Sequence, residues 1–321
     1  RTTTRAAFGT TACSADSTSS RPFSSAKTCA SFDSCSSMVT TPLAEIATDF
    51  WAHRDLLHQL TLRDIRLRYK QAVMGFAWSI LTPTLIVLSG VIVRLGMARF
   101  AGSPLAAADV ASVAVKGPAW AFFVGSISFA TASVVANSVL VTKVYFPREM
   151  LPLSAVLAQG FDSLIAAMAV AVLLPFLGVG ASAALLWVPL LVLLLVLLTA
   201  GAALLLSCAN LFFRDVKYIV QVGLTFGIFF TPVLFEPAVF GSRGAALMML
   251  NPVAPLLEGL RLAVVAQHDL LEPLTVISAG GQSVLAWTPW YLAYAALWSV
   301  GGAVISALVF HRLEYVFAEY V

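Results

Sequence analysis

The sequence has little charge. Of its 321 residues, 11% are Asp, Glu, Lys or Arg, 60% are hydrophobic, and the mean hydropathy is +0.90. A typical soluble domain is about 25% charged, so this chain lacks the polar surface that a soluble globule of its size needs. The composition excludes a disordered chain, a disulfide-rich secreted scaffold and an ordinary cytosolic enzyme. It indicates a polytopic membrane protein. The net charge is only +3, with no basic face outside short loops, so we expect no nucleic-acid partner.

Cysteine and histidine are also scarce. The chain has four of each, and they form neither a CxxC pair nor a mixed Cys/His cluster, which argues against a zinc site or a redox motif. The motifs GxxxxGK(S/T), HExxH and GxSxG are absent from the sequence as well, so it offers no phosphate-binding loop and no hydrolase nucleophile. We therefore expect no catalytic residue, no metal site and no cofactor bound by this chain itself.

The first 37 residues differ from the rest because Ser and Thr dominate them. They contain no apolar run long enough for a signal peptide, and such a segment cannot bury enough apolar surface to fold. We expect residues 1–37 to be a disordered tail that is not native, with Met38 as the natural start. An organelle transit peptide, which is also rich in Ser and Arg, and a linker are the alternatives.

Long apolar runs fill the rest of the chain. A helix needs about 20 mostly apolar residues to cross a bilayer, and these runs are continuous rather than alternating, which excludes a membrane barrel. A turn at 178–180 joins the third and fourth runs. The sequence predicts an all-α polytopic membrane protein with six transmembrane helices, at 75–93, 118–141, 151–174, 183–209, 219–235 and 290–310.

Basic residues are concentrated on one side of these spans. Dense groups precede the first span, separate the second from the third and the fourth from the fifth, and follow the sixth. The opposite loops carry basic residues spread over far more sequence. Because cytoplasmic loops are enriched in Lys and Arg, we expect both termini to be cytoplasmic.

The segment 38–74 reads as an amphipathic helix before the first span. Its apolar residues recur at helical intervals, with charged residues between them; they are Ile46, Phe50, Leu57, Leu60 and Leu67. Its position favours a helix that lies in the cytoplasmic membrane interface. A soluble helix packed on a partner is the alternative.

One acidic residue, Asp162, lies deep within a predicted span, and Gln159 precedes it by one helical turn. An ionisable group at that depth suggests a function. The alternative is a paired Asp that pins the third span to a neighbour.

The loop 142–149 is short, charged and aromatic. It contains Lys143, Tyr145, Phe146, Pro147, Arg148 and Glu149. Aromatic anchors beside Arg are typical of a docking site for a partner protein. From the residues alone, an aromatic pair that faces lipid headgroups is equally possible.

The segment 236–287 is too apolar for a free loop. Prolines at 252 and 255 suggest short helices that stop and start there and dip into the outer membrane surface. Glu258 and Arg261 are three residues apart and could pair on one helix face. A plain extracytoplasmic cap is the alternative.

Five stretches in this order resemble the membrane-spanning subunit of type-2 ABC transporters, in the branch that exports cell-surface polysaccharides and teichoic acids. They are RDIRLRYKQAVMGFAWSILTPTL (63–85), TKVYFPREMLPLSAVLAQGFD (142–162), FRDVKYIVQ (213–221), FFTPVLF (229–235) and NPVAPLLEGLR (251–261). The resemblance covers the chain from about residue 43 onwards. Residues 270–287 read as a longer and looser outer loop than the family would have.

This resemblance implies a homodimer of six-span subunits in the bacterial inner membrane, served by two copies of a separate ATPase that binds ATP and magnesium. It implies that 142–149 contacts the ATPase, that Glu258 and Arg261 belong to the outer gate, and that Phe226, Phe229 and Phe230 line a canal for a lipid-linked polysaccharide. An exporter of lipids or small drugs is the alternative within transporters. A membrane glycosyl- or acyltransferase would need a polar catalytic cluster, and the sequence offers none.

The predicted topology can be tested with reporter fusions. Fusions after Phe100 and Gly241 should report an outside location, and fusions after Lys143 and Lys217 an inside location, because basic clusters stay cytoplasmic. One reversed reporter in this set would contradict the six-span arrangement.

Overall fold

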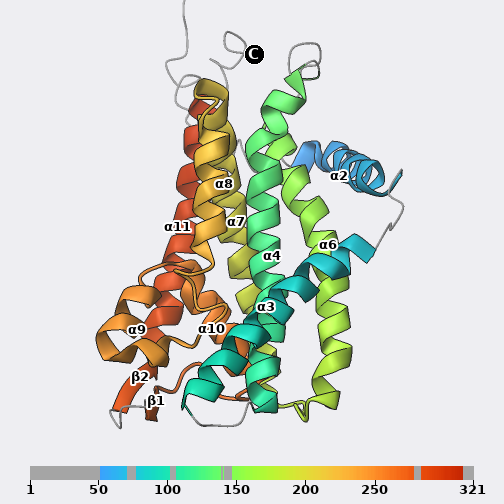
Figure 1. Ribbon diagram of the computed structural model, residues 1–321. Helices are drawn as coiled ribbons and strands as arrows, with labels where there is room; N and C mark the ends of the chain where they lie inside the picture. Colours follow the sequence, from blue (N-terminus) through green and yellow to red (C-terminus); the bar gives the residue numbers. More distant parts are fainter. Residues whose placement is uncertain are drawn as a thin grey trace, which may run out of the picture. The chain divides into compact units, whose positions relative to one another are not determined.

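The computed structural model describes residues 51–70, 77–101, 106–138, 140, 147–277 and 283–313. The predicted tail 1–37, the start of the amphipathic helix and most of the loop 142–149 lie outside these residues. Within them the chain is mainly helical (Figure 1). The long helices are α2 (Arg54–Tyr69), α3 (Ala77–Ala101), α4 (Ala107–Ala136), α6 (Met150–Phe176), α7 (Trp187–Phe212) and α11 (Pro289–Leu313).

Five segments of the described residues are long and apolar enough to cross a membrane. They are Ile80–Arg99, Ala107–Ala136, Met150–Phe176, Ala183–Phe212 and Pro289–Leu313. They match the first, second, third, fourth and sixth predicted spans. The prediction of an all-α polytopic membrane protein is confirmed.

The predicted fifth span differs from a regular membrane helix. Helix α8 (Val216–Gly227) has only 12 residues, and the chain continues through turns from 228 to 235. At a rise of about 1.5 Å per residue, such a helix is about 18 Å long. It is therefore too short to cross by itself a hydrocarbon core of about 30 Å.

The second span is longer than predicted. Helix α4 begins at Ala107, eleven residues before the start expected from hydropathy at 118. The backbone N–H of Ala106 donates to Oδ2 of Asp109 at 3.1 Å, which satisfies one of the donors left open at a helix N-terminus. As a result Lys116, read from sequence as a loop residue, lies inside a helix.

Two glycines allow tight helix connections. Gly178, in the turn between α6 and α7, has a φ of +78°, which a residue with a side chain adopts only at a cost. A Cβ on Gly201 of α7 would lie 3.0 Å from the backbone of Ala303 in α11. Small residues at such a crossing let two membrane helices approach closely.

Helix α4 lies at the centre of the bundle and packs against α3, α6, α7, α8 and the short helix α10 (Val253–Val264) (Figure 1). The main apolar core joins side chains of α4, α7, α10 and the turns after α8, including Trp120, Leu195, Val233 and Leu257. This arrangement explains why a large part of α4 is buried.

Helix α2 packs on the bundle, mainly against α6. Its buried residues Leu57 and Leu60 belong to a second apolar cluster that contains Met150 and Leu151 of α6 and Phe310 of α11. The predicted helix is therefore present over the described residues, with part of its apolar face turned toward the protein. Leu67, expected on the same face, is exposed.

The segment 236–287 contains the short helices that its prolines predicted. They are η4 (Pro237–Phe240), α9 (Gly241–Met249) and α10 (Val253–Val264). The expectation of a loose loop at 270–287 is wrong for the described part, because β1 (Leu274–Ile277) and β2 (Ser283–Trp287) pair as an antiparallel hairpin. The buried indole of Trp287 donates from Nε1 to the carbonyl of Leu270 at 2.9 Å, and this hydrogen bond fixes the base of the hairpin.

Candidate functional site

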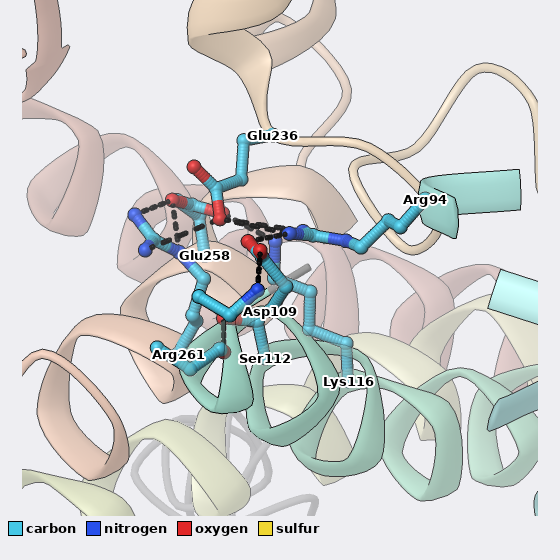
Figure 2. Close-up of polar contacts among 9 residues, drawn as sticks. Arg94, Asp109, Ser112, Lys116, Glu236, Glu258 and Arg261 are labelled. Carbon is cyan, nitrogen blue, oxygen red and sulfur yellow. Dashed lines mark hydrogen bonds and ion pairs between the residues drawn. The ribbon is translucent and has the colours of Figure 1, made fainter. Parts of the chain in front are cut away.

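Six charged side chains from separate parts of the chain converge beside α10 (Figure 2). We call them the charge cluster. They are Arg94 of α3, Asp109 and Lys116 of α4, Glu236 after the α8 turns, and Glu258 and Arg261 of α10. Three are cations and three are carboxylates, so the cluster as a whole is neutral.

The inner part of the cluster is a triad of Lys116, Glu258 and Arg261, and the Arg261 side chain is 12% exposed. Nζ of Lys116 donates to Oε2 of Glu258 at 2.6 Å, and the two side chains are 0% and 1% exposed. Arg261 donates from Nε to the other carboxylate oxygen, Oε1, at 2.7 Å. Both oxygens of Glu258 therefore accept from a cation, which is the condition under which a buried carboxylate is tolerated.

The outer part is more accessible and centres on Glu236. Its Oε1 lies 3.3 Å from Nη2 of Arg94 and 3.6 Å from Nη1 of Arg261. Arg94 also donates from Nη1 to Oδ1 of Asp109 at 2.7 Å. Glu236 thus links the segment that follows α8 to both α3 and α10.

The local field keeps Glu258 ionised. Burial alone would raise its pKa, but the adjacent Lys116 ammonium and Arg261 guanidinium outweigh burial and lower the pKa to about 2. Glu258 is therefore a carboxylate throughout the physiological pH range, and the triad keeps its attraction there.

The predicted pairing of Glu258 with Arg261 is confirmed. Sequence reasoning missed the other four members of the charge cluster. Hydropathy placed Lys116 in a loop, although Asp109 and Lys116 are seven residues apart and so share one face of a helix. A single cation within the apolar run 110–122 was the available signal, because such a cation needs a buried partner.

A second polar site surrounds Asp162. Arg68 of α2 donates from Nη1 to Oδ2 of Asp162 at 2.6 Å and to Oε1 of Gln159 at 2.8 Å. Tyr69 donates to Oδ1 of Asp162, and the Arg68 guanidinium lies 4.0 Å above the ring centroid of Phe129. Asp162 is therefore paired, as the structural alternative expected, with α2 as its partner.

Only three of the six predicted coupling residues lie in described segments. Pro147, Arg148 and Glu149 precede α6, whereas Lys143, Tyr145 and Phe146 lie outside the described residues. Glu149 is buried, and its Oε1 is 3.7 Å from Nδ1 of His311 in α11.

Helix α2 forms hydrogen bonds with the helices on both sides of this loop. Arg63 donates from Nη2 to Oδ1 of Asn137 at the end of α4, at 3.1 Å. On the other side, Ser154 of α6 donates to Oδ2 of Asp64 at 3.0 Å, and Asp64 pairs with Arg63 at 2.9 Å. Helices α4 and α6, which flank the loop, are thus both hydrogen-bonded to α2.

The predicted canal residues lie on the exposed side of the bundle. Phe226 of α8 and Phe229 and Phe230 of the following turns are 58%, 56% and 72% exposed, and α8 has no buried residue. These rings therefore do not pack in the core of the described subunit. A position facing lipid and a position facing a canal both agree with this exposure.

The chain matches no family model. Its sequence is similar to curated proteins named O-antigen export system permease protein RfbA. Two from Klebsiella pneumoniae are each 26% identical over 271 residues, which is 83% of this chain and 94% of the relative. One from Myxococcus xanthus is 28% identical over 254 residues, 76% of this chain and 94% of the relative. The chain is a relative of O-antigen export permeases. The resemblance to type-2 ABC permeases is confirmed, and the names of the relatives indicate a transport subunit.

The buried triad should be essential for stability. Replacing Lys116 with Met leaves Glu258 buried beside Arg261 alone, and breaking a buried ion pair commonly costs about 3–5 kcal/mol. We expect Lys116→Met to lower the melting temperature of the detergent-solubilised protein strongly. The double variant Lys116→Met/Glu258→Leu should recover part of the loss, since it removes both charges of the pair and leaves Arg261 with Glu236 at 3.6 Å.

The exposed pair between Arg54 and Asp55, at 3.9 Å, provides the control. Arg54→Ala should change stability by less than about 1 kcal/mol. If Lys116→Met melts at the same temperature as Arg54→Ala, the triad does not hold α10 on α4.

Proposed function

We propose that this chain is the membrane subunit of an ABC exporter that moves a lipid-linked O-antigen polysaccharide outward across the bacterial inner membrane. The observation that carries the proposal is the similarity to O-antigen export permeases over 83% of the chain. Five long apolar helices agree with a multi-pass membrane subunit. ATP hydrolysis, with its magnesium ion, belongs in this proposal to a separate partner subunit.

The assembly we propose contains two copies of this chain and two copies of the ATPase. Both termini would lie in the cytoplasm. The exposed face of α8, with Phe226, Phe229 and Phe230 at its end, suits a canal between the two copies. Aromatic faces can stack on sugar rings without forming directional hydrogen bonds, so a polymer can slide past them.

The loop 142–149 is proposed to transmit motion from the ATPase. Tyr145 and Phe146 would fill a pocket on the ATPase, and Lys143, Arg148 and Glu149 would set the register. The links from Arg63 to Asn137 and from Asp64 to Ser154 support this role, because they connect α2 to the two helices that flank the loop. Glu258 and Arg261 would belong to the outer gate.

The proposed function is tested by deletion in the native host. Loss of this chain should remove O-antigen from the cell surface and leave lipid-linked polymer inside the cell. The chain supplied in trans should restore the surface polymer. Unchanged surface O-antigen in the deletion strain would refute the function.

The coupling role predicts a specific effect of Phe146→Ala. Removing a central aromatic anchor commonly costs about 2 kcal/mol or more of binding free energy, and rim charges cost less. Phe146→Ala should reduce co-purification of the ATPase or uncouple ATP hydrolysis from export, whereas Lys143→Ala should act mildly. Phe213→Ala, which removes an exposed ring outside the loop, is the matched control. Wild-type pull-down and export for Phe146→Ala would show that the loop is only a turn.

The canal role predicts a different effect for the α8 rings. The triple variant Phe226→Ala/Phe229→Ala/Phe230→Ala should slow export while leaving ATPase binding intact, because the rings would contact the polymer and not the partner. Phe176→Ala, which removes an exposed ring at the end of α6, should export normally. Equal export rates for the two variants, measured by pulse labelling of surface polymer, would assign the α8 rings to lipid contact.

A further inference from the structure

A cavity of about 400 Å³ lies between α2, α3, α4 and α6, next to Asp162. Its size falls within the range of about 300–1,000 Å³ that is usual for small-molecule sites. Arg68 and Tyr69 line it from α2, Trp120 and Phe129 from α4, and Gln159 and Asp162 from α6. The wall thus combines aromatic faces with converging polar groups.

The cavity is electrically balanced. Among the described residues that line it, only Arg68 and Asp162 carry charge, and they pair at 2.6 Å. Arg68 is further held by Gln159 and by the Phe129 ring. The polar groups are therefore held in place and present both donors and acceptors with no net charge.

We infer that this cavity is a saccharide subsite, which holds one or two uncharged sugar units of the polymer as it passes. The inference rests on the proposed function. A sugar hydroxyl both donates and accepts hydrogen bonds, so a sugar can engage an arginine, a carboxylate and an amide together. The aromatic part of the wall suits the apolar face of a sugar ring.

The same geometry disfavours two other occupants. A phosphate that approaches Arg68 comes close to the Asp162 carboxylate, 2.6 Å from the same guanidinium, and like charges at that range repel strongly. A lipid acyl chain would leave Arg68, Asp162 and Gln159 facing hydrocarbon, which is costly for polar groups.

Site-directed cysteine labelling tests the subsite. Ser163, a lining residue on α6, is changed to Cys in a chain whose four natural cysteines are replaced. The variant is prepared with its ATPase in phospholipid nanodiscs and treated with a water-soluble methanethiosulfonate reagent. The probes are the O-polysaccharide released from the native host by mild acid and, separately, inorganic phosphate.

The subsite predicts labelling that the polysaccharide slows. At a concentration about ten times the dissociation constant, labelling should slow about tenfold, because only the empty fraction reacts. Phosphate should have no effect. Ser242→Cys, at an exposed position of α9, should be labelled without protection. If Ser163→Cys does not assemble, Thr82→Cys, a lining residue on α3, replaces it.

Two further variants separate a binding role from an anchoring role. Asp162→Asn and Asp64→Asn each weaken a polar link between α2 and α6, but only Asp162 lines the cavity. With Ser163→Cys, Asp162→Asn should raise the dissociation constant of the polysaccharide, measured by protection, about tenfold, which is the loss expected for a charge-assisted hydrogen bond. Asp64→Asn should leave protection unchanged.

Absence of labelling, protection by phosphate alone, no protection by polysaccharide, or equal effects of the two Asn variants would each overturn the subsite. The deletion experiment separates this result from the proposed function. If deletion abolishes surface O-antigen but polysaccharide gives no protection, the proposed export function is supported and only the saccharide subsite is refuted.

Discussion

The bundle depends on the buried pair between Lys116 and Glu258. Neither side chain is accessible to water, so each charge needs its partner for as long as the protein is folded. This requirement fixes α10 against the N-terminal part of α4. Glu236 pairs with both Arg261 and Arg94, and these ion pairs connect α10 to the segment after α8 and to the end of α3. A short helix such as α10 gains little stability from its own backbone, and the triad supplies a directional attachment that apolar packing cannot give.

Helix α2 connects two sites that are separate in the sequence. Arg63 and Asp64 contact Asn137 and Ser154, which lie on the two sides of the proposed coupling loop. Arg68 and Tyr69, about one helical turn further on, contact Asp162. All four of these α2 residues belong to one rigid element of 16 residues. A single helix therefore contacts Asp162 and both helices that flank the proposed coupling loop.

Hydropathy and helical periodicity predicted most of the fold, because each span needs an unbroken apolar run. The exceptions have physical causes. The charge of Lys116 interrupted the hydropathy signal of α4. Its partner Glu258 lies 142 residues away in the chain, so no local pattern revealed the pair. The hairpin at 274–287 was missed because its strands are short and depend on the Trp287 anchor. At the second site, the sequence identified Gln159 and Asp162 from their depth. It could not identify Arg68, because no local pattern encodes the packing of α2 on α6.

The early end of α8 has a consequence for hydration. From 228 to 235 the backbone forms turns, so carbonyl groups in this stretch leave the regular helical ladder. Hydrocarbon cannot satisfy such groups, and irregular backbone at membrane depth is tolerated only against protein or beside water. Thr231, Val233 and Leu234 lie buried in the bundle, whereas Phe229 and Phe230 face outward. At membrane depth, the outward side of this stretch therefore needs protein or water beside it, and a lipid annulus around a single subunit provides neither.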